Sequence, residues 1–454
     1  MQVVIAGEDI VGYRIAEELM HGHDVTFVGP VEPAGTRLDQ LDVQVVHGAI
    51  TAPEVLRQAR MGSCDVFVAC TDSDESNLVA CVAAQGLGAK RTICMLSSPG
   101  FLSVADDDVA LAEALGIHSV VRPSEQLAEE ILRIVTVPGA LDVQEFADGR
   151  VKLLRYAVEA GAPITRKRLR YLSLPRHVQL IMLRRGDEMI VPQGDTLLQA
   201  GDKVTAMGRW TSLRRLLLKF LRKETTSAEP RTAAVVGGGT VGFAVTRGLE
   251  EAGWHVKLIE IQRARCEEIA GQLESLVLYG DGADLDLLQQ EAIDQVSVLV
   301  AVANNDEKNL LVSLLAKQLG VKRTVTRAER LSNELMFEKV GVDVVRSAKG
   351  AAIRSVVRSI DQGNLEIQAE LEHGDACVIE LRLPADYRAV LLSELAPPAF
   401  ARVGSILRDR KLIIPSGEDE LRPGDEILVI CTRADEAQTR DYFLMPHPAG
   451  AVAS

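Results

Sequence analysis

Short runs of aliphatic residues alternate with helical segments in two separate stretches of the chain. The aliphatic runs lie at 25–28, 66–70, 256–259 and 298–302, and the helical segments that follow include 77–86 and 309–320. Alternation of this kind is typical of right-handed β-α-β units, which build a doubly wound parallel sheet. Both stretches are therefore predicted to be α/β lobes with a Rossmann-like fold.

A different pattern follows each of these lobes. The residues there form short alternating strands, broken by Pro-Gly and Gly-Asp turns, with one short helix. This pattern predicts a small α+β lobe after each Rossmann-like lobe.

The two halves of the chain repeat each other. The segments CTDSDESNLVACVAAQGLGAKRT and VANNDEKNLLVSLLAKQLGVKRT are related by a constant spacing of 232 residues, from Thr92 to Thr324. The small lobes repeat MIVPQGDTLLQAGDKVTAM as LIIPSGEDELRPGDEILVI at a spacing of 223 residues, from Pro192 to Pro415. Fixed spacing indicates duplication of a two-lobe unit, with the differences in length placed in loops.

This repeat divides the chain into eight segments. We expect a first N-lobe at 1–123, a connecting helix at 124–138, a first C-lobe at 139–222, a linker at 223–230, a second N-lobe at 231–348, a connecting helix at 349–362, a second C-lobe at 363–445 and a flexible tail at 446–454.

A glycine-rich turn in the second N-lobe carries the main chemical signal. It lies in VVGGGTVGFAVTRGLEEAGWHVKLIE, between a strand and a helix, and the next strand ends in an acid. Gly237 permits the tight turn, Gly239 lets a pyrophosphate approach the backbone, and Gly242 lets helix and strand pack closely. The acid, Glu260, can accept hydrogen bonds from ribose hydroxyls and would repel a 2′-phosphate. The sequence thus favours NAD or ATP over NADP, with contacts from Gly237, Gly238, Gly239, Thr240, Val241, Gly242 and Glu260.

Other candidate residues follow later strands of the same lobe. Ligands bind at the carboxyl ends of the strands in open α/β sheets. The residues expected there are Gly280 and Asp281 after the third strand, Ala303, Asn304, Asn305 and Glu307 after the fourth, and Arg327 in the fifth.

The corresponding positions in the first N-lobe have changed. Gly7 and Gly12 remain, but Asp9 replaces the second glycine and Gly29 replaces the acid; Ala49 and Met95 stand where the second lobe has Asp281 and Arg327. A carboxylate about 4 Å from a phosphate charge costs on the order of 4 kcal/mol at an effective dielectric near 20. We predict that this lobe binds a dinucleotide poorly or not at all and is retained for assembly.

With these motifs, the chain resembles TrkA, the family of peripheral nucleotide-binding subunits of bacterial Trk potassium uptake systems. That family is built from two tandem RCK units, regulators of potassium conductance, each with a Rossmann-like N-lobe and a small C-lobe. The resemblance covers about residues 1–445, and the order of the motifs carries it: GGGTVG, Glu260, the GD pair at 280–281, the DExN runs at Asp74 and Asp306, and the paired PxG…GD segments.

The resemblance implies a homotetrameric ring that gates a TrkH-like membrane pore and responds to NAD(H), ATP or ADP. It also implies a cytoplasmic protein, attached to the inner membrane through that partner. An alternative is a gating module for another ion transporter, with a C-lobe that binds a cyclic dinucleotide as related domains do.

Composition excludes several other classes of protein. The formal net charge of −14 argues against a nucleic-acid partner. The seven cysteines form no CxxC pair, which predicts buried free thiols in a reducing cytosol. The chain begins directly with strand residues and contains no apolar run long enough to span a bilayer, so we expect a soluble cytoplasmic protein.

An NAD-dependent oxidoreductase is the main alternative, because GxGxxG is commonest in dehydrogenases. Hydride transfer needs a polar catalytic group and a substrate pocket, and the C-lobes offer no suitable arrangement, so we predict no catalytic residue. The histidines show no metal-ligand spacing, and the cluster 106–108 has a structural explanation in acids that open a helix, so we predict no metal. The DExN acids also fit helix starts, and in the second lobe they could contact ribose. The basic segment Leu213–Lys223 fits a last helix with inward leucines better than a membrane surface.

Overall fold

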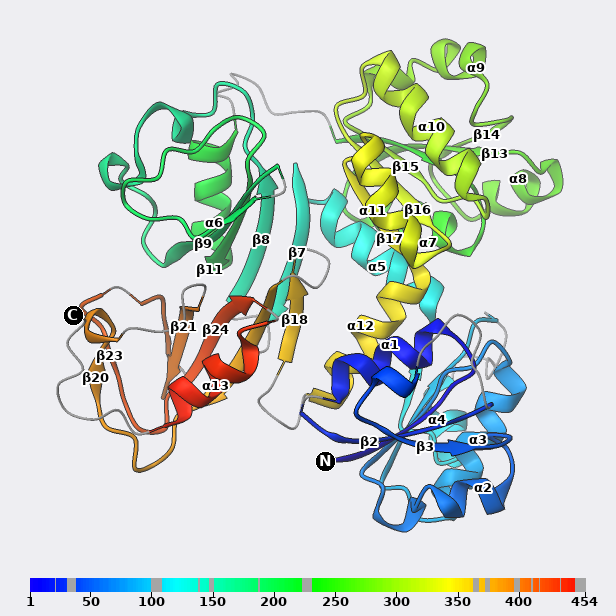
Figure 1. Cartoon of the computed structure of the whole chain (residues 1–454). Helices are drawn as coiled ribbons and strands as arrows, with labels where there is room; N and C mark the ends of the chain where they lie inside the picture. The colour runs from blue at the N-terminus through cyan, green and yellow to red at the C-terminus, as the bar shows by residue number, and fades with distance from the viewer. Residues whose placement is uncertain are drawn as a thin grey trace. The chain divides into compact units, whose positions relative to one another are not determined.

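The computed structural model describes residues 1–20, 22–30, 38–98, 108–137, 139–146, 151–186, 188–222, 231–361, 367–371, 376–395, 401–409, 411–415, 417–432 and 434–445. The chain forms two compact units, each built from two stretches (Figure 1). One unit consists of Met1–Leu132 and Pro230–Ile360 and holds both N-lobes. The other consists of Arg133–Glu229 and Asp361–Ser454 and holds both C-lobes.

The first N-lobe contains a six-stranded parallel sheet in the order β3-β2-β1-β4-β5-β6. Its strands are β1 (Gln2–Ala6), β2 (Asp24–Gly29), β3 (Gln44–His47), β4 (Val66–Ala69), β5 (Arg91–Met95) and β6 (Ser119–Val121). Its helices are α1 (Ile10–Leu19), α2 (Pro53–Gln58), α3 (Asp74–Gly86) and α4 (Asp108–Ala114), with 3-10 turns at Leu38–Gln40 and Met61–Ser63. The strand order reverses between β1 and β4, where such sheets bind ligands.

The second N-lobe repeats this sheet in the order β14-β13-β12-β15-β16-β17. Its strands are β12 (Thr232–Val236), β13 (His255–Glu260), β14 (Leu276–Tyr279), β15 (Val298–Ala301), β16 (Thr324–Ala328) and β17 (Val344–Ser347). Its helices are α7 (Thr240–Glu251), α8 (Arg263–Ala270), α9 (Leu285–Gln290), α10 (Asp306–Leu319) and α11 (Leu331–Val340), with a 3-10 turn at Ile293–Gln295. The predicted pair of doubly wound parallel sheets is thus confirmed.

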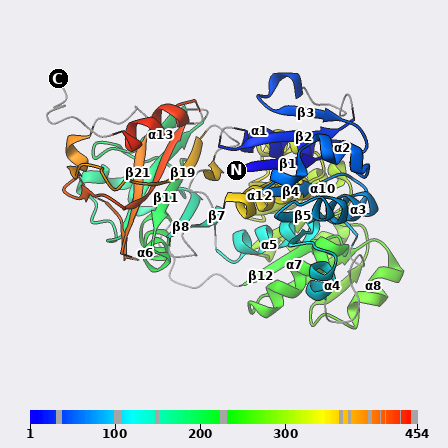
Figure 2. The ribbon, with the colours of Figure 1, turned by 90° about the horizontal axis from the view of Figure 1, so that it is seen from below.

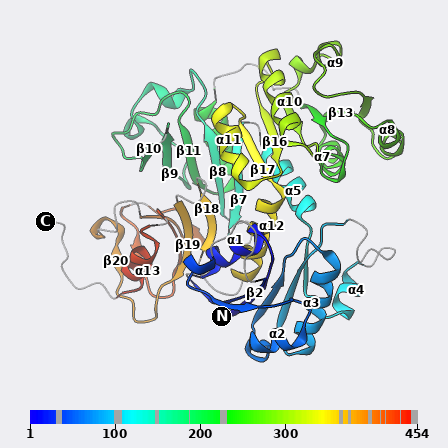
Figure 3. The same cartoon turned by 45° about the vertical axis from the view of Figure 1, so that its right-hand side comes forward.

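The connecting helices α5 (Pro123–Val135) and α12 (Ala348–Asp361) are exchanged between the N-lobes. The apolar face of α12, with Ile353 and Val356, is buried in the core of the first lobe beside β1 and α1. Figures 2 and 3 show α12 next to β1 and next to α1. In the other direction, Leu132 of α5 lies so close to Gly248 of α7 that an added Cβ would be 2.5 Å from its Cδ1. Each connecting helix therefore packs against the lobe of the other half.

The two C-lobes contain five-stranded antiparallel sheets in the orders β10-β9-β11-β8-β7 and β18-β19-β24-β21-β22. The first has β7 (Ala140–Phe146), β8 (Val151–Ala157), β9 (Val178–Arg185), β10 (Glu188–Ile190), β11 (Lys203–Gly208) and α6 (Trp210–Leu216), with 3-10 turns at Pro163–Arg166 and Leu169–Tyr171. The second has β18 (Ile367–Leu371), β19 (Ala376–Arg382), β21 (Arg402–Arg408), β22 (Lys411–Ile413), β24 (Glu426–Thr432) and α13 (Glu436–Leu444), plus a hairpin of β20 (Val390–Leu391) and β23 (Glu420–Leu421) and a 3-10 turn at Leu392–Glu394. This is the small α+β lobe that the sequence predicts.

The repeated Gly-Asp turns of the C-lobes each hold an ion pair between a buried aspartate and a partly exposed arginine. Asp202 receives two bonds from Arg185, of 2.9 and 2.8 Å, and Asp425 receives two from Arg408, both of 2.7 Å. Each aspartate also accepts a backbone N–H from the residue three positions earlier. The duplicated motif therefore fixes the turn before β11 and before β24.

The basic segment near the end of the first C-lobe is the inward-facing helix that we predict. The segment continues from α6 into a π-helical turn at Leu217–Leu221, and its leucines at 213, 216, 217 and 221 are buried. No helix in the described ranges has both the length and the apolar character needed to cross a bilayer. The interpretations placed on the 106–108 cluster, the linker and the tail concern side chains that lie outside the described residues.

Candidate nucleotide site

The glycine turn of the second N-lobe links β12 to α7. Gly237 has φ of 106°, in the left-handed region that favours glycine. A Cβ at Gly242 would lie 1.7 Å from the carbonyl oxygen of Gly237, so no larger residue fits there. These two glycines are required by the backbone, because they allow the helix to start directly behind the strand.

Gly239 stands in a different situation, although it lies in the same turn. It precedes the first residue of α7 with φ of −66°, and apart from Gly239 itself and its two neighbours in the chain no atom lies within 4 Å of the position that a Cβ would take. Within the described chain, no side chain caps this end of α7. The amides at a helix start point outward and the helix dipole adds positive potential, so this position suits an anion.

The acid at the end of β13 supports the glycine turn. Glu260 is buried, its Oε2 accepts the Gly238 N–H at 2.5 Å, and its Oε1 accepts the Gln262 N–H at 2.8 Å. A carboxylate has further acceptor capacity, so Glu260 can also accept a bond from a hydroxyl of a ribose. A second anion beside this buried charge would be repelled.

Asp281 lies at the end of β14, in an ion pair that the sequence did not indicate. Lys308 of α10 donates to its Oδ2 at 2.8 Å, and the Ala283 N–H donates to its Oδ1 at 3.0 Å. The bond from Lys308, followed by the backbone bond, lowers the pKa of Asp281. A Cβ at the neighbouring Gly280 would lie 2.5 Å from Cδ2 of Leu287, so a larger residue would displace this leucine side chain. In the sequence, Lys308 differs from Ser76, the equivalent residue of the first lobe, but this difference does not reveal its partner.

The segment after β15 is held by the asparagine of the DExN run. Asn309 bonds to both the N–H and the carbonyl oxygen of Ala303 and to the carbonyl oxygen of Arg327. Asn305 caps α10 by accepting the Lys308 N–H at 2.7 Å.

The aspartates of the DExN runs lie in the first turns of α3 and α10 and bind these helix starts to neighbouring segments. Asp306 accepts bonds from the Glu329 N–H and from Asn333, and Asp74 in the first lobe accepts two from Ser97 and Ser98. The runs therefore have a structural role in both lobes. Among the described residues, Glu307 of the second run makes no hydrogen bond.

Two arginines bring positive charge to the same edge of the sheet. Arg327 donates to Asn304 Oδ1 and to Glu329 Oε2, both at 2.6 Å. Arg265, which the sequence analysis missed, donates from Nε to the carbonyl oxygen of Gly238 at 2.8 Å and lies over the ring of Phe243. Arg265 therefore lies at the glycine turn after β12, whereas Arg327 in β16 and Lys308 in α10 are each paired with an acid.

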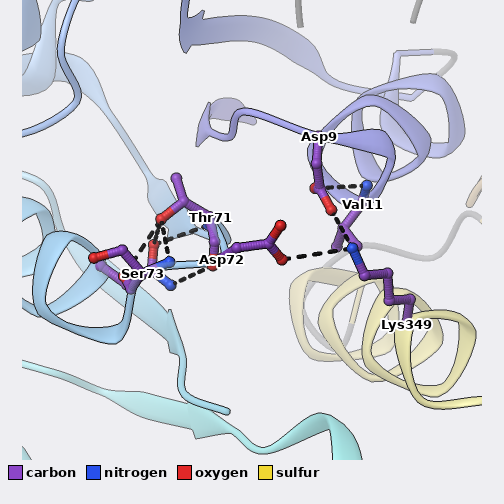
Figure 4. A network of polar contacts seen from close by, with 7 residues as sticks. Asp9, Val11, Thr71, Asp72, Ser73 and Lys349 are labelled. Carbon is purple, nitrogen blue, oxygen red and sulfur yellow. Dashed lines mark hydrogen bonds and ion pairs between the residues drawn. The ribbon is translucent and has the colours of Figure 1, made fainter. Parts of the chain in front are cut away.

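In the first N-lobe, the position that matches Gly239 is filled by an ion pair. Asp9 caps α1 by accepting the Val11 N–H at 2.9 Å, and Lys349 of α12 donates to its other oxygen at 2.6 Å (Figure 4). Lys349 also lies 3.5 Å from Asp72. Burial opposes the charge of Lys349, but its bonds to Asp9 and Asp72 give a net rise in its pKa. The helix start that would receive a phosphate already holds a carboxylate.

The position that matches Glu260 is closed as well. A Cβ at Gly29 would lie 2.3 Å from the carbonyl oxygen of Gly7 and 2.9 Å from the ring of Phe27. No acid can stand at this strand end without movement of the backbone. Because Lys349 compensates the charge of Asp9, the first lobe differs from the second by an occupied amide and a closed strand end, and not by an uncompensated negative charge.

The cysteines are the remaining residues with reactive side chains, and they lie in the cores of the lobes. All seven cysteines are free and buried, as the sequence predicts, and burial raises the pKa of Cys64 to about 12. The Sγ atoms of Cys377 and Cys431 lie 3.6 Å apart on adjacent strands. Among the described residues, no group of three or more His, Cys, Asp and Glu side chains is arranged to hold a metal ion.

An open glycine turn on one Rossmann-type sheet, a filled turn on its repeat, and a small antiparallel lobe after each define a tandem pair of two-lobe modules of the nucleotide-binding type, with the open turn in the second module only. The TrkA-N domain matches residues 3–123 and 233–348, and the TrkA-C domain matches residues 153–221 and 378–444. The chain belongs to the TrkA family.

A sequence relative and solved structures are similar over nearly the whole chain, the structures in fold alone. The Trk system potassium uptake protein TrkA homolog 2 of Methanosarcina mazei is 32% identical, over 94% of this chain and 97% of that protein. Among solved structures, the GsuK channel is similar in fold, with a TM-score of 0.59, 21% identity, and coverage of 97% of this chain and 78% of that chain. The GsuK channel bound to NAD has a TM-score of 0.55 and 19% identity, and covers 96% and 78%.

Proposed function

We propose that this protein is the nucleotide-sensing regulatory subunit of a Trk-type potassium uptake system. The observation that carries the proposal is the asymmetry between the N-lobes: the start of α7 at Gly239 is free, whereas Asp9 fills the start of α1. Relatives that match the full chain are Trk system potassium uptake proteins, which gives the transport role.

The proposed ligand is NAD(H), ATP or ADP, bound once per chain in the second N-lobe. Its phosphates would lie on the amides of residues 237–242, and its ribose would bond to Glu260. Contacts from the ends of the neighbouring strands would come from Gly280, Asp281, Ala303, Asn304, Asn305, Glu307 and Arg327. The GsuK channel has been solved with NAD, which supports this class of ligand.

The proposed partner is a TrkH-like membrane pore, contacted by a homotetrameric ring at the cytoplasmic face of the inner membrane. A ligand shifts a conformational equilibrium only by its difference in affinity for the two states, and couplings of about 1 to 3 kcal/mol are typical. Contacts from several strand ends and from α7 can supply such a difference. The same reasoning requires no turnover of the nucleotide, so we propose that the protein is not an enzyme.

Calorimetric titration of the purified chain with NAD, NADH, ATP, ADP and NADPH tests the ligand. We expect one site per chain, and weaker binding of NADPH because its 2′-phosphate would meet Glu260. NADH oxidation and ATP hydrolysis should stay at the background rate. Two equal sites per chain, or measurable turnover, would contradict the proposal.

Rubidium uptake tests the transport role. The chain is produced together with a TrkH-type pore in bacteria that lack their own potassium uptake, and uptake is compared with that of the pore alone. We expect uptake to depend on the chain and to change when Gly239 is replaced so that nucleotide no longer binds. Equal uptake with and without the chain would exclude a regulatory role.

A further inference from the structure

Several ion pairs join the two halves of the chain within the N-lobe unit. In those formed by Asp9, Asp72 and Glu130, the acid comes from the first half and the base from the second. Arg354 of α12 binds Glu130 of α5 with two bonds of 2.9 and 2.6 Å, and Arg346 lies 3.8 Å from the same carboxylate. Lys349 binds Asp9 at 2.6 Å. Glu130 is buried, so its charge needs this partner.

The repeat identifies the matching residues of the other lobe. Val121 pairs with Met95 in the first sheet as Arg346 pairs with Arg327 in the second, and Met95 and Arg327 are themselves equivalent. The spacing between equivalent residues is therefore 225 in this region, from Val121 to Arg346. At the same spacing the apolar faces of α5 and α12 also coincide.

The charged residues of these ion pairs differ between equivalent positions of the two halves of the chain. The bases of the second lobe have no basic counterpart: Arg346 corresponds to Val121, Lys349 to Ser124 and Arg354 to Glu129. The acids of the first lobe have no acidic counterpart: Asp9 corresponds to Gly239, Asp72 to Asn304 and Glu130 to Ser355. Two first lobes paired in this way would bring Glu129 opposite Glu130 and leave Asp9 without a base. Two second lobes would leave the bases without acids.

Equivalent positions of the two C-lobes also carry opposite charges, here with the base in the first half of the chain and the acid in the second. The inner faces of β8 and β19 share one core cluster, which contains Val151, Leu153, Ala376 and Val378. Alternation along the strands places Arg155 and Glu380 on these same faces, and both residues are buried. Arg155 pairs with Thr205 of β11, and Glu380 pairs with Leu428 of β24. Thr205 and Leu428 are related by the spacing of 223 residues, so Arg155 and Glu380 occupy equivalent positions.

We propose that the first N-lobe is a recognition surface for the second. Three acids of the first half of the chain select the bases of the second half: they are Asp9 at the start of α1, Asp72 after β4 and Glu130 on α5, and the bases are Arg346 in β17 and Lys349 and Arg354 on α12. The same acids reject the α5 helix of another first lobe. The altered glycine motif thereby has a function of its own, because Asp9 binds a lysine where an intact motif would leave room for a phosphate. This inference does not depend on nucleotide binding in the second lobe.

Charge reversal in the full-length chain tests the contact. Glu130→Arg and Arg354→Glu should each lower the folding equilibrium constant at least about tenfold in urea unfolding, and the double variant should recover most of the loss. As a matched control, reversal of the exposed pair Arg263 and Glu267 within α8 should change the constant only about twofold. If Glu130→Arg does not fold, Glu130→Gln and Arg354→Gln replace the reversals in the same cycle. Additive losses without recovery would overturn the proposal.

Relocation of the base tests the selectivity. Glu129→Arg with Arg354→Glu moves the arginine from the second lobe to the equivalent position of the first, so that two first lobes can satisfy each other's Glu130. With Gln126→Cys on α5 as a reporter, a bifunctional maleimide should join two chains at least about fivefold more in the relocated variant than in the reporter alone. Equal cross-linking in both, or strong cross-linking in the reporter alone, would show that these charges do not select the partner.

Discussion

Replacement of Gly239 by aspartate copies the first lobe's residue into the second lobe and tests the proposed site most directly. The open space around Gly239 and its φ of −66° mean that the substitution fits the backbone. By analogy with Asp9, the new carboxylate should accept the N–H of Val241 and cap α7. A capping aspartate in place of glycine changes stability by only a few tenths of a kcal/mol, so Gly239→Asp should unfold at or slightly above the wild-type temperature.

The expected loss of affinity follows from the amide that both anions would use. A ligand phosphate on the first turn of α7 would lie about 4 Å from the new carboxylate, and the repulsion there is on the order of 4 kcal/mol at an effective dielectric near 20. Lys349 relieves the charge of Asp9 in the first lobe, but the matching residue beside the second lobe is Ser124, which carries no charge. The full repulsion corresponds to about a thousandfold, and we expect the Kd to rise at least about a hundredfold.

Isothermal titration with ADP and NADH measures the effect, together with a thermal melt of each variant. Gly239→Asn is the matched control, because asparagine has the size and capping ability of aspartate without its charge. It should lose clearly less affinity than Gly239→Asp. Binding by Gly239→Asp within fivefold of wild type, with unchanged stability, would refute the placement of the phosphates at this turn.

Three further predictions follow from the packing and the ionic contacts. Gly242→Ala should lower the melting temperature and abolish binding together, because its Cβ would lie 1.7 Å from a carbonyl oxygen; a folded variant with normal binding would refute this. All seven thiols should resist a thiol reagent at pH 8 and react only when urea unfolds the chain, since every cysteine is buried. The lowered pKa of Asp281 stabilises the fold above the unfolded value of 3.8, and this contribution disappears as the pH falls through the lower folded value. The unfolding free energy should therefore fall less between pH 5 and pH 3 in Asp281→Asn than in the wild type. The difference should be at most about 1 kcal/mol, because the ion pair of Asp281 and Lys308 is exposed.

Local patterns in the sequence predicted both sheets and the conformation of the glycine turn. Strands buried on both faces appear as continuous aliphatic runs, so the alternation with helices was sufficient to predict two doubly wound sheets. Gly237 and Gly242 meet constraints from their own turn, which the motif describes. Gly-Asp pairs repeated at fixed spacing indicated that Asp202 and Asp425 had equivalent places, although the arginines that bind them were not foreseen.

Contacts between the halves of the chain could not be predicted in this way. The apolar face of α12 indicates that the helix is buried, but it does not say against which lobe. Lys349 is an ordinary lysine near a helix start until α12 is placed beside α1, and only then does it explain Asp9. Lys308 and Arg265 are similar cases, because their partners lie on other strands or turns.

The geometry of the first lobe also predicts that its nucleotide site cannot be restored by reversing the visible substitutions. Asp9→Gly would free the Val11 amide, but the acid that belongs at residue 29 would require a Cβ 2.3 Å from the carbonyl oxygen of Gly7. Asp9→Gly combined with Gly29→Glu should therefore lower stability, and titration with ADP or NADH should still give one site per chain. Asp9→Gly alone should also give one site, because Lys349 can attract a phosphate but nothing at Gly29 can hold the ribose. A second site of comparable affinity in either variant would show that only the charge of Asp9 had kept nucleotides out, and that the strand end can move to admit them.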